Sequence, residues 1–166
     1  MSASLLDDAM AHHIWATEQL IDACGELTAE QLARPAPGTY GSVLDTLRHL
    51  LASDSWYLTF FRDEPPAIDG GTEASLDDLR AKIAANGRAW LEVLAGGPDA
   101  DTDVVEHGDG WNYHAPLGLR LAQVIHHGTD HRSQVCTALT SFGLTPPEID
   151  LWNWGEAVGR VRPEYL

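Results

Sequence analysis

The amino-acid sequence predicts an all-α fold, a four-helix bundle with a small β-hairpin-like insertion before the last long helix. Apolar residues recur every three or four positions through four long segments, the period of an amphipathic helix. Short runs rich in Gly and Pro separate these segments. Because there is neither an internal repeat nor a linker, residues 1–166 are expected to form a single domain.

The first helix is expected over residues 4–24, because apolar side chains recur along one side and Gly25 is a typical helix end. A short capped turn follows, with Thr28 as its N-cap and Gln31 at the capping-box position. The Pro and Gly content of residues 34–41 predicts a loop.

The second helix is expected to begin at the N-cap Ser42 and to run to about Phe61, with leucines along one side. Residues 65–71 contain two prolines and two glycines and predict another loop. The third helix is expected to begin after Ser75 and to stop at Gly96.

Residues 104–114 lack the helical period and contain a Gly-rich turn, which predicts the hairpin. The last long helix is expected over residues 117–142. Its apolar side repeats at alternating spacings of four and three, through Leu117, Leu121, Val124, Gly128, His131, Val135 and Ala138. The aromatic tail, residues 149–155, is expected to pack back on the helices.

The composition excludes some classes of partner. There are 25 Asp and Glu against 10 Lys and Arg, a formal charge of −15. Nucleic acid and anionic membrane both require clustered positive charge, so neither is expected as a partner. No signal peptide and no membrane-spanning run is apparent, which predicts a soluble, cytoplasmic protein. Cys24 and Cys136 are far apart and lack zinc-ribbon or redox spacing.

Two histidines on the last helix are the strongest chemical signal. His127 and His131 are four residues apart, so their imidazoles lie on one face of a helix. A single buried histidine is most often satisfied by a hydrogen bond within the core. Two stacked imidazoles each need a partner, and one metal ion satisfies both.

His49, midway along the second helix, is the candidate third ligand. It lies at the edge of the leucine side, where it could face the pair from a neighbouring helix. Three histidines without a fourth protein ligand leave a coordination position open, as catalytic sites do. Imidazoles suit Zn, Ni, Fe or Cu, and the residues leave this choice open.

The remaining histidines carry weaker predictions. His126 points about 100° away from His127 and is expected at the surface or beside the ligands. For His13 we favour packing over a place at a pocket mouth. His107 and His114 bracket the hairpin turn and could approach each other, although exposed polar positions are the default.

Other side chains allow both a functional and a structural interpretation. Arg132 could hold an anionic substrate or pair with one of the many carboxylates. Trp15, Trp56 and Tyr57 could form a pocket wall or part of the core. No residue stands out as a general base.

The residues Thr46-Leu-Arg-His49-Leu and His127-Gly-Thr-Asp-His131-Arg-Ser-Gln134, with Ser42, resemble the DinB/YfiT-like family. Ile14-Trp-Ala and Pro147-Glu-Ile-Asp resemble its terminal signatures, so the likeness spans nearly the whole chain. One departure is Ser133, where a glycine is common.

The resemblance implies an antiparallel four-helix bundle and often a homodimer. It implies one divalent metal, zinc or nickel foremost with iron, manganese or copper as alternatives, held by His49, His127 and His131. Relatives with known activities are transferases or isomerases that use low-molecular-weight thiols such as mycothiol, bacillithiol or glutathione.

The leading functional hypothesis is therefore a metal-dependent enzyme, a transferase or a hydrolase, acting on a small molecule. Its metal would act as a Lewis acid and lower the pKa of a bound water or thiol. The alternative is a non-catalytic metal-binding or stress-response protein. A ferritin-type di-iron site is disfavoured, since the chain has no Glu-x-x-His motif.

Overall fold

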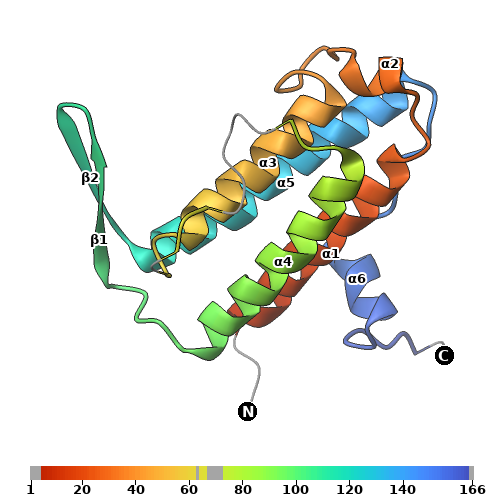
Figure 1. Ribbon diagram of the computed structural model, residues 1–166. Coiled ribbons are helices and arrows are strands. Elements are labelled where there is room, and N and C mark those ends of the chain that lie inside the picture. The colour runs from red at the N-terminus through yellow and green to blue at the C-terminus, as the bar shows by residue number, and fades with distance from the viewer. Residues whose placement is uncertain (1–4, 63, 67–72, 165–166) are drawn as a thin grey trace.

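The computed structural model describes residues 5–62, 64–66 and 73–164, and within these the chain is mostly helical. Four helices are long and lie side by side (Figure 1). The elements in chain order are α1 (Leu5–Cys24), α2 (Ala29–Ala33), α3 (Val43–Leu58), α4 (Leu76–Ala95), β1 (Asp103–Gly108), β2 (Trp111–Pro116), α5 (Leu117–Ser141) and α6 (Leu151–Ala157). The predicted helical fold with a hairpin before the last long helix is confirmed.

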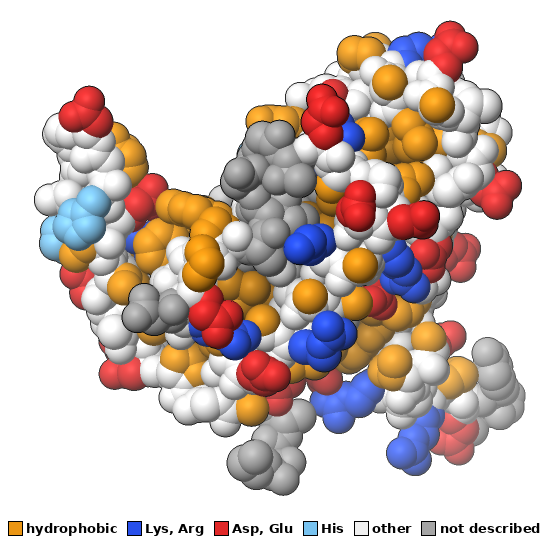
Figure 2. Space-filling view, in the orientation of Figure 1, with side chains coloured by type: hydrophobic (Ala, Val, Ile, Leu, Met, Phe, Trp, Pro, Cys, Tyr) orange, Lys and Arg blue, Asp and Glu red, His pale blue; other side chains and the backbone are white. Residues whose placement is uncertain are grey.

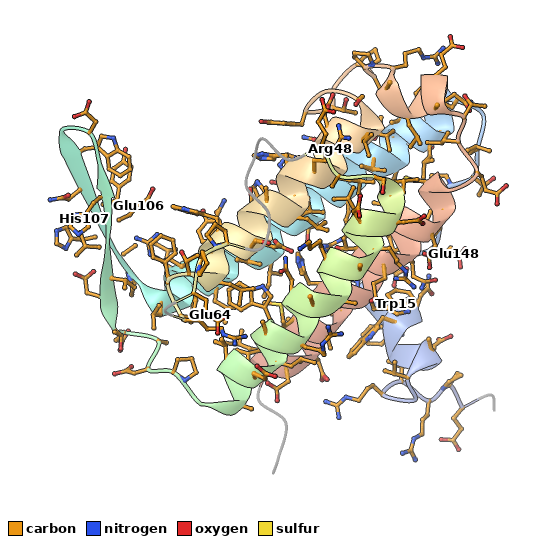
Figure 3. The ribbon with its side chains drawn as sticks, in the orientation of Figure 1. Trp15, Arg48, Glu64, Glu106, His107 and Glu148 are labelled. Atoms are coloured by element: carbon orange, nitrogen blue, oxygen red, sulfur yellow. The ribbon has the colours of Figure 1, made fainter. Side chains whose placement is uncertain are left out.

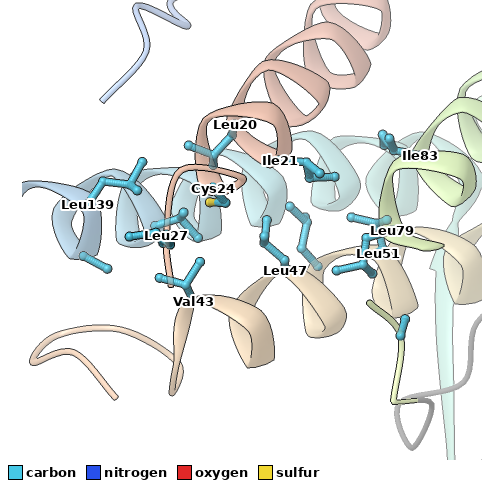
Figure 4. Close-up of a cluster of buried hydrophobic side chains, with 14 of the residues drawn as sticks. Leu20, Ile21, Cys24, Leu27, Val43, Leu47, Leu51, Leu79, Ile83 and Leu139 are labelled. Carbon is cyan, nitrogen blue, oxygen red and sulfur yellow. The ribbon is translucent and has the colours of Figure 1, made fainter. Parts of the chain in front are cut away.

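The long helices enclose a shared apolar core. Helix α1 contacts α4 and α5, and α3 contacts the same two helices. Leucines from every side meet there, as Figure 4 shows around Leu20, Leu47 and Leu139, all at most 1% exposed. Fully burying one such side chain contributes roughly 1.5–3 kcal/mol. This packing holds α3 and α5 against each other, and these two helices carry the histidines.

The helix starts predicted at Thr28, Ser42 and Ser75 are confirmed by their caps. Thr28 and Gln31 form a capping box at α2, and Ser42 and Asp45 form one at α3. Helix α3 ends at Leu58, earlier than predicted. The next three backbone N–H groups bond to carbonyls three residues back, so the chain tightens into turns before residue 61.

Two parts of the sequence prediction fall outside the described residues. The predicted start of the first helix at Ser4 does so, and the loop over residues 65–71 is described only at Pro65 and Pro66.

The hairpin projects from the long helices as a separate arm (Figures 1 and 2). Its strands pair in an antiparallel register, and Gly110 in the turn adopts a φ of 79° that favours glycine. Arg120 of α5, only 5% exposed, fastens the base of the arm. Its guanidinium donates to the carbonyl of Val104 in β1, and its Cζ atom lies 3.8 Å from the ring centroid of Phe60.

The tail after α5 packs against α1, as predicted from its aromatic content. Trp154 is buried, and its ring meets the ring of His12 edge-on. His12 Nε2 also forms a 2.8 Å hydrogen bond with the carbonyl of Ile149. Arg160 and Asp8 form an ion pair that joins the segment after α6 to α1. None of the described helices has the length and apolarity needed to cross a membrane.

Acidic side chains are scattered over the face shown in Figure 2, with basic side chains among them. This distribution is that of a solvated surface.

Candidate metal centre

Three imidazoles converge between α3 and α5. The Nε2 atom of His127 lies 3.1 Å from Nε2 of His49 and 3.1 Å from Nε2 of His131. One nitrogen from each of the three rings lies within 4.8 Å of the other two. The structure therefore brings together the three histidines that the sequence singled out.

The spacing of these nitrogens suits one divalent ion. Zinc–nitrogen bonds of about 2.0–2.1 Å in a tetrahedron place two ligand nitrogens roughly 3.3 Å apart. The two separations from His127, both 3.1 Å, are close to that value, and the third pair of nitrogens lies within 4.8 Å. Of the described residues, no cysteine or carboxylate joins the three histidines as a further ligand group. The donor set is thus three neutral imidazoles, which suits Zn, Ni, Fe or Cu.

A glutamine fixes the tautomer of His131. Gln134 Oε1 lies 2.9 Å from His131 Nδ1, and it also accepts the backbone N–H of Tyr40 at 3.1 Å. An oxygen that accepts from Tyr40 is an acceptor for His131 too, so the imidazole proton lies on Nδ1. Nε2 of His131 then carries a lone pair directed at the other two rings, as a metal ligand requires.

The loop before α3 covers His49. The Tyr40 ring stacks on the His49 imidazole with centroids 4.0 Å apart and planes 13° apart, and it lies nearly perpendicular to the His131 ring. Hydrogen bonds from the Thr39 hydroxyl to the carbonyls of Ala36 and Gly41 hold this loop in shape. Tyr40 itself remains 56% exposed, so it forms part of the solvent-facing wall of the site.

The surroundings of His127 and His49 favour their uncharged form. Burial, together with the neighbouring His131 and His49, lowers the pKa of His127 from 6.5 to about 4. Burial and then His131 also lower the pKa of His49. Neutral imidazole is the form that binds metal, so neither ring must lose a proton near pH 7 before binding.

A buried polar network lies on the α1 side of the histidines. Arg132 Nη1 donates to His13 Nδ1 at 2.9 Å, and His13 Nε2 lies 2.8 Å from Asp54 Oδ2. Arginine is only a donor, so His13 accepts at Nδ1 and carries its one proton on Nε2. A neutral imidazole thereby links a buried carboxylate to a buried guanidinium, and both charges stay compensated.

This network decides the sequence interpretations of Arg132 and His13. Arg132 is 3% exposed and bonded to His13 and Thr17, so it neither reaches a substrate nor pairs directly with a carboxylate. His13 is fully buried, so it does not line a pocket mouth, and the favoured reading of a packed residue is confirmed. Neither partner was apparent from sequence, because α1, α3 and α5 meet here only after folding.

The other predicted residues lie away from the three imidazoles. His126 is exposed, as expected of a residue that points away from His127. The hairpin register places His107 opposite Asn112 and His114 opposite Val105, so the two histidines do not face each other. Their rings bond to Asn112 and Asp103, respectively.

The aromatic candidates divide by location. Trp15 lies beside α6 and contacts His12, so it belongs to the packing of the tail (Figure 3). Trp56 is partly exposed and lines a shallow surface hollow with Thr59 and Arg62. Tyr57 is half-buried and packs its edge against Trp56. Only Trp56 thus retains the role of a pocket-wall candidate.

Three residues of the site carried no role in the sequence interpretation: Tyr40, Asp54 and Gln134. Only Gln134 had a usable signal, since its position three residues after His131 lets the two side chains meet on one helix face. Tyr40 and Asp54 approach the histidines only through the packing of other segments.

Comparison with known proteins adds the family. A family model described as the DinB family matches residues 1–158. No curated protein matches the chain with significant similarity. The match covers nearly the full length, including all three histidines and the residues that orient them. The chain therefore belongs to the DinB family.

Proposed function

We propose that this protein is a metal-dependent enzyme that acts on a small molecule. It holds one divalent metal ion through His49, His127 and His131. The reaction class we favour is transfer or isomerisation with a low-molecular-weight thiol. The observation that carries the proposal is the convergence of three imidazole nitrogens within 4.8 Å, with the lone pair of His131 fixed by Gln134.

The ligand set supports a catalytic ion more than a structural one. Structural zinc sites have four protein ligands, whereas the described residues offer three. When bound, the ion would supply Lewis acidity to a thiol or water at the remaining position. The chain's residues would position that ion between α3 and α5, with Tyr40 stacked on the ligand His49 at the solvent-facing wall.

The scaffold we propose for this site is a four-helix bundle. In support, α1, α3, α4 and α5 each contact two of the others, as neighbours around a bundle do. A homodimer, as in many relatives, is part of the proposal and would be measured by sedimentation equilibrium.

Metal binding is tested first, with His131→Ala and a matched control. Wild-type protein loaded with Zn(II) or Ni(II) and freed of excess metal is expected to retain about one ion per chain. His131→Ala should lose that ion, while His126→Ala, a change at an exposed neighbouring histidine, should retain it. Full occupancy in His131→Ala would contradict the three-histidine site.

Catalysis is tested on protein shown to be metal-loaded. Conjugation of mycothiol, bacillithiol and glutathione with a panel of electrophiles is measured with wild type and with His131→Ala. Turnover that depends on one thiol and disappears in the variant supports the enzyme. Metal occupancy without turnover on any thiol would favour a non-catalytic metal-binding protein instead.

A further inference from the structure

Two buried polar atoms near the metal centre have no partner among the described residues. One is Nδ1 of His127, the nitrogen that does not face the other imidazoles. The other is Oδ1 of Asp54, the oxygen that does not bond to His13. A buried donor and a buried acceptor left unsatisfied each cost about 1–3 kcal/mol, so paired arrangements are strongly favoured.

One buried ring connects this carboxylate to the segment that carries the imidazole. The His13 ring bonds to Asp54 at 2.8 Å and lies against Gly128, the residue that follows His127. Asp54 belongs to α3 and is 1% exposed, so its second oxygen lies in the interior between the helices rather than in solvent. His127 reaches the same interior from α5, which packs against α3.

Asp54 is also held rigidly. Its Oδ2 accepts the Nε2–H of His13, and Arg132 fixes His13 from the opposite side. Gly128 makes this arrangement possible, since a Cβ at that position would lie 2.3 Å from His13 Cε1. Helices α1, α3 and α5 thus jointly determine where the second oxygen of Asp54 points.

We propose that Asp54 is a positioning residue for the metal centre, with Oδ1 accepting the Nδ1–H of His127 directly or through one bridging water. This inference rests on the proposed metal site. Metal-binding histidines nearly always donate their second ring N–H to a carboxylate, carbonyl or water, which fixes the tautomer and the ring orientation. Gln134 serves His131 in this way, and Asp54 serves His127.

The affinity test compares Asp54→Asn with Thr17→Val. The asparagine keeps one oxygen for His13 but turns an NH2 donor toward the N–H of His127. Its Zn(II) affinity, measured by competition with a chromophoric chelator, should fall about 10–100-fold. Thr17→Val removes an acceptor of Arg132 in the same buried network without changing the carboxylate, so its zinc affinity should match wild type.

The free energy of unfolding of each metal-free variant is measured beside its affinity. A structural role alone predicts that the two variants lose zinc affinity in proportion to their loss of stability. Affinity in Asp54→Asn equal to wild type, or affinity losses that follow stability in both variants, would overturn the inference.

A high-resolution crystal structure of the metal-free wild type tests the contact without any variant. It should show Asp54 Oδ1 and His127 Nδ1 in contact or bridged by one water. A structure with each atom bonded to a different partner overturns the inference even where zinc binds. Conversely, the contact present in a protein that binds no metal would reject the proposed function and leave the pairing of the two residues standing.

Discussion

The ring of Tyr40 stacks on the imidazole of His49, with centroids 4.0 Å apart and planes 13° apart. The first residue belongs to the loop before α3 and the second to the middle of α3, so the loop folds back over its own helix. The same ring also meets the ring of His131, so one short segment contacts two of the three imidazoles. The backbone N–H of Tyr40 in addition bonds to Gln134, which holds His131.

Removal of the Tyr40 ring is expected to loosen His49. A stacked aromatic pair contributes about 0.5–1.5 kcal/mol, so Tyr40→Ala should weaken zinc binding roughly two- to tenfold. Tyr40→Phe keeps the stacked ring and should bind zinc like wild type. Chelator competition measures both. Equal affinities in the alanine and phenylalanine variants would mean that the stack does not position His49.

Gln134→Leu is expected to free the orientation of His131. The substitution removes the acceptor of His131 Nδ1 and of the Tyr40 N–H, so zinc affinity should fall about 10–100-fold. Ser133→Ala changes the exposed preceding residue and should leave affinity unaltered. The helix content of both variants, measured by circular dichroism, should remain native. A zinc affinity of wild-type strength in Gln134→Leu would refute the role of this amide.

Gly128→Ala is expected to destabilise the protein although alanine favours helices. The added Cβ would lie 2.3 Å from Cε1 and 2.5 Å from Nδ1 of His13, which forces the buried network apart. Overpacking of this kind costs about 1–3 kcal/mol.

The control for Gly128→Ala is Gly118→Ala in the first turn of the same helix, where the nearest atom is Ala100 Cβ at 3.1 Å. Its effect should be within about 1 kcal/mol, because the helix propensity gained offsets the tighter contact. Urea unfolding compares the two variants. A Gly128→Ala protein as stable as the control would mean that α5 can move away from His13.

The metal-free protein is expected to lose stability between about pH 7 and pH 4. His127 takes up its proton near pH 6.5 when unfolded and only near pH 4 when folded. The unfolded chain therefore binds more protons in this window, and stability falls as the pH is lowered.

Partial exposure of His127 limits this effect to the order of 1–2 kcal/mol. Urea midpoints at several pH values measure it, and His127→Asn should flatten the dependence. A wild-type midpoint that stays constant from pH 7 to pH 4.5 would contradict the lowered pKa.

The two cysteines are expected to differ in reactivity. Cys24 is fully buried, and burial raises the pKa of its thiol to about 12. Cys136 is half-buried, although burial raises its pKa as well. Thiol reagents should therefore modify Cys136 first and reach Cys24 only on unfolding, because the thiolate is the reactive form. Mass spectrometry of native protein after limited alkylation gives the order, and earlier modification of Cys24 would be the opposite result.

The helices and their starting points follow from sequence because they depend on local interactions. Ser42 and Asp45, or Thr28 and Gln31, are three residues apart and cap a helix wherever that helix lies. The end of α3 at Leu58 was missed for the opposite reason. The apolar period continues through Phe60 and Phe61, and the periodicity does not register a final turn tightened by i to i−3 bonds.

The sequence by itself determined the histidine pair of α5 and identified His49 as its candidate partner, since helical spacing fixes which side chains share a face. Only the tertiary structure decided what surrounds them. The network of Asp54, His13 and Arg132 joins three helices through contacts up to 119 residues apart in the chain. The placement of Tyr40 over His49 depends on how a loop folds back. Such contacts arise from packing between distant segments, and the local periodicity of the sequence carries no information about that packing.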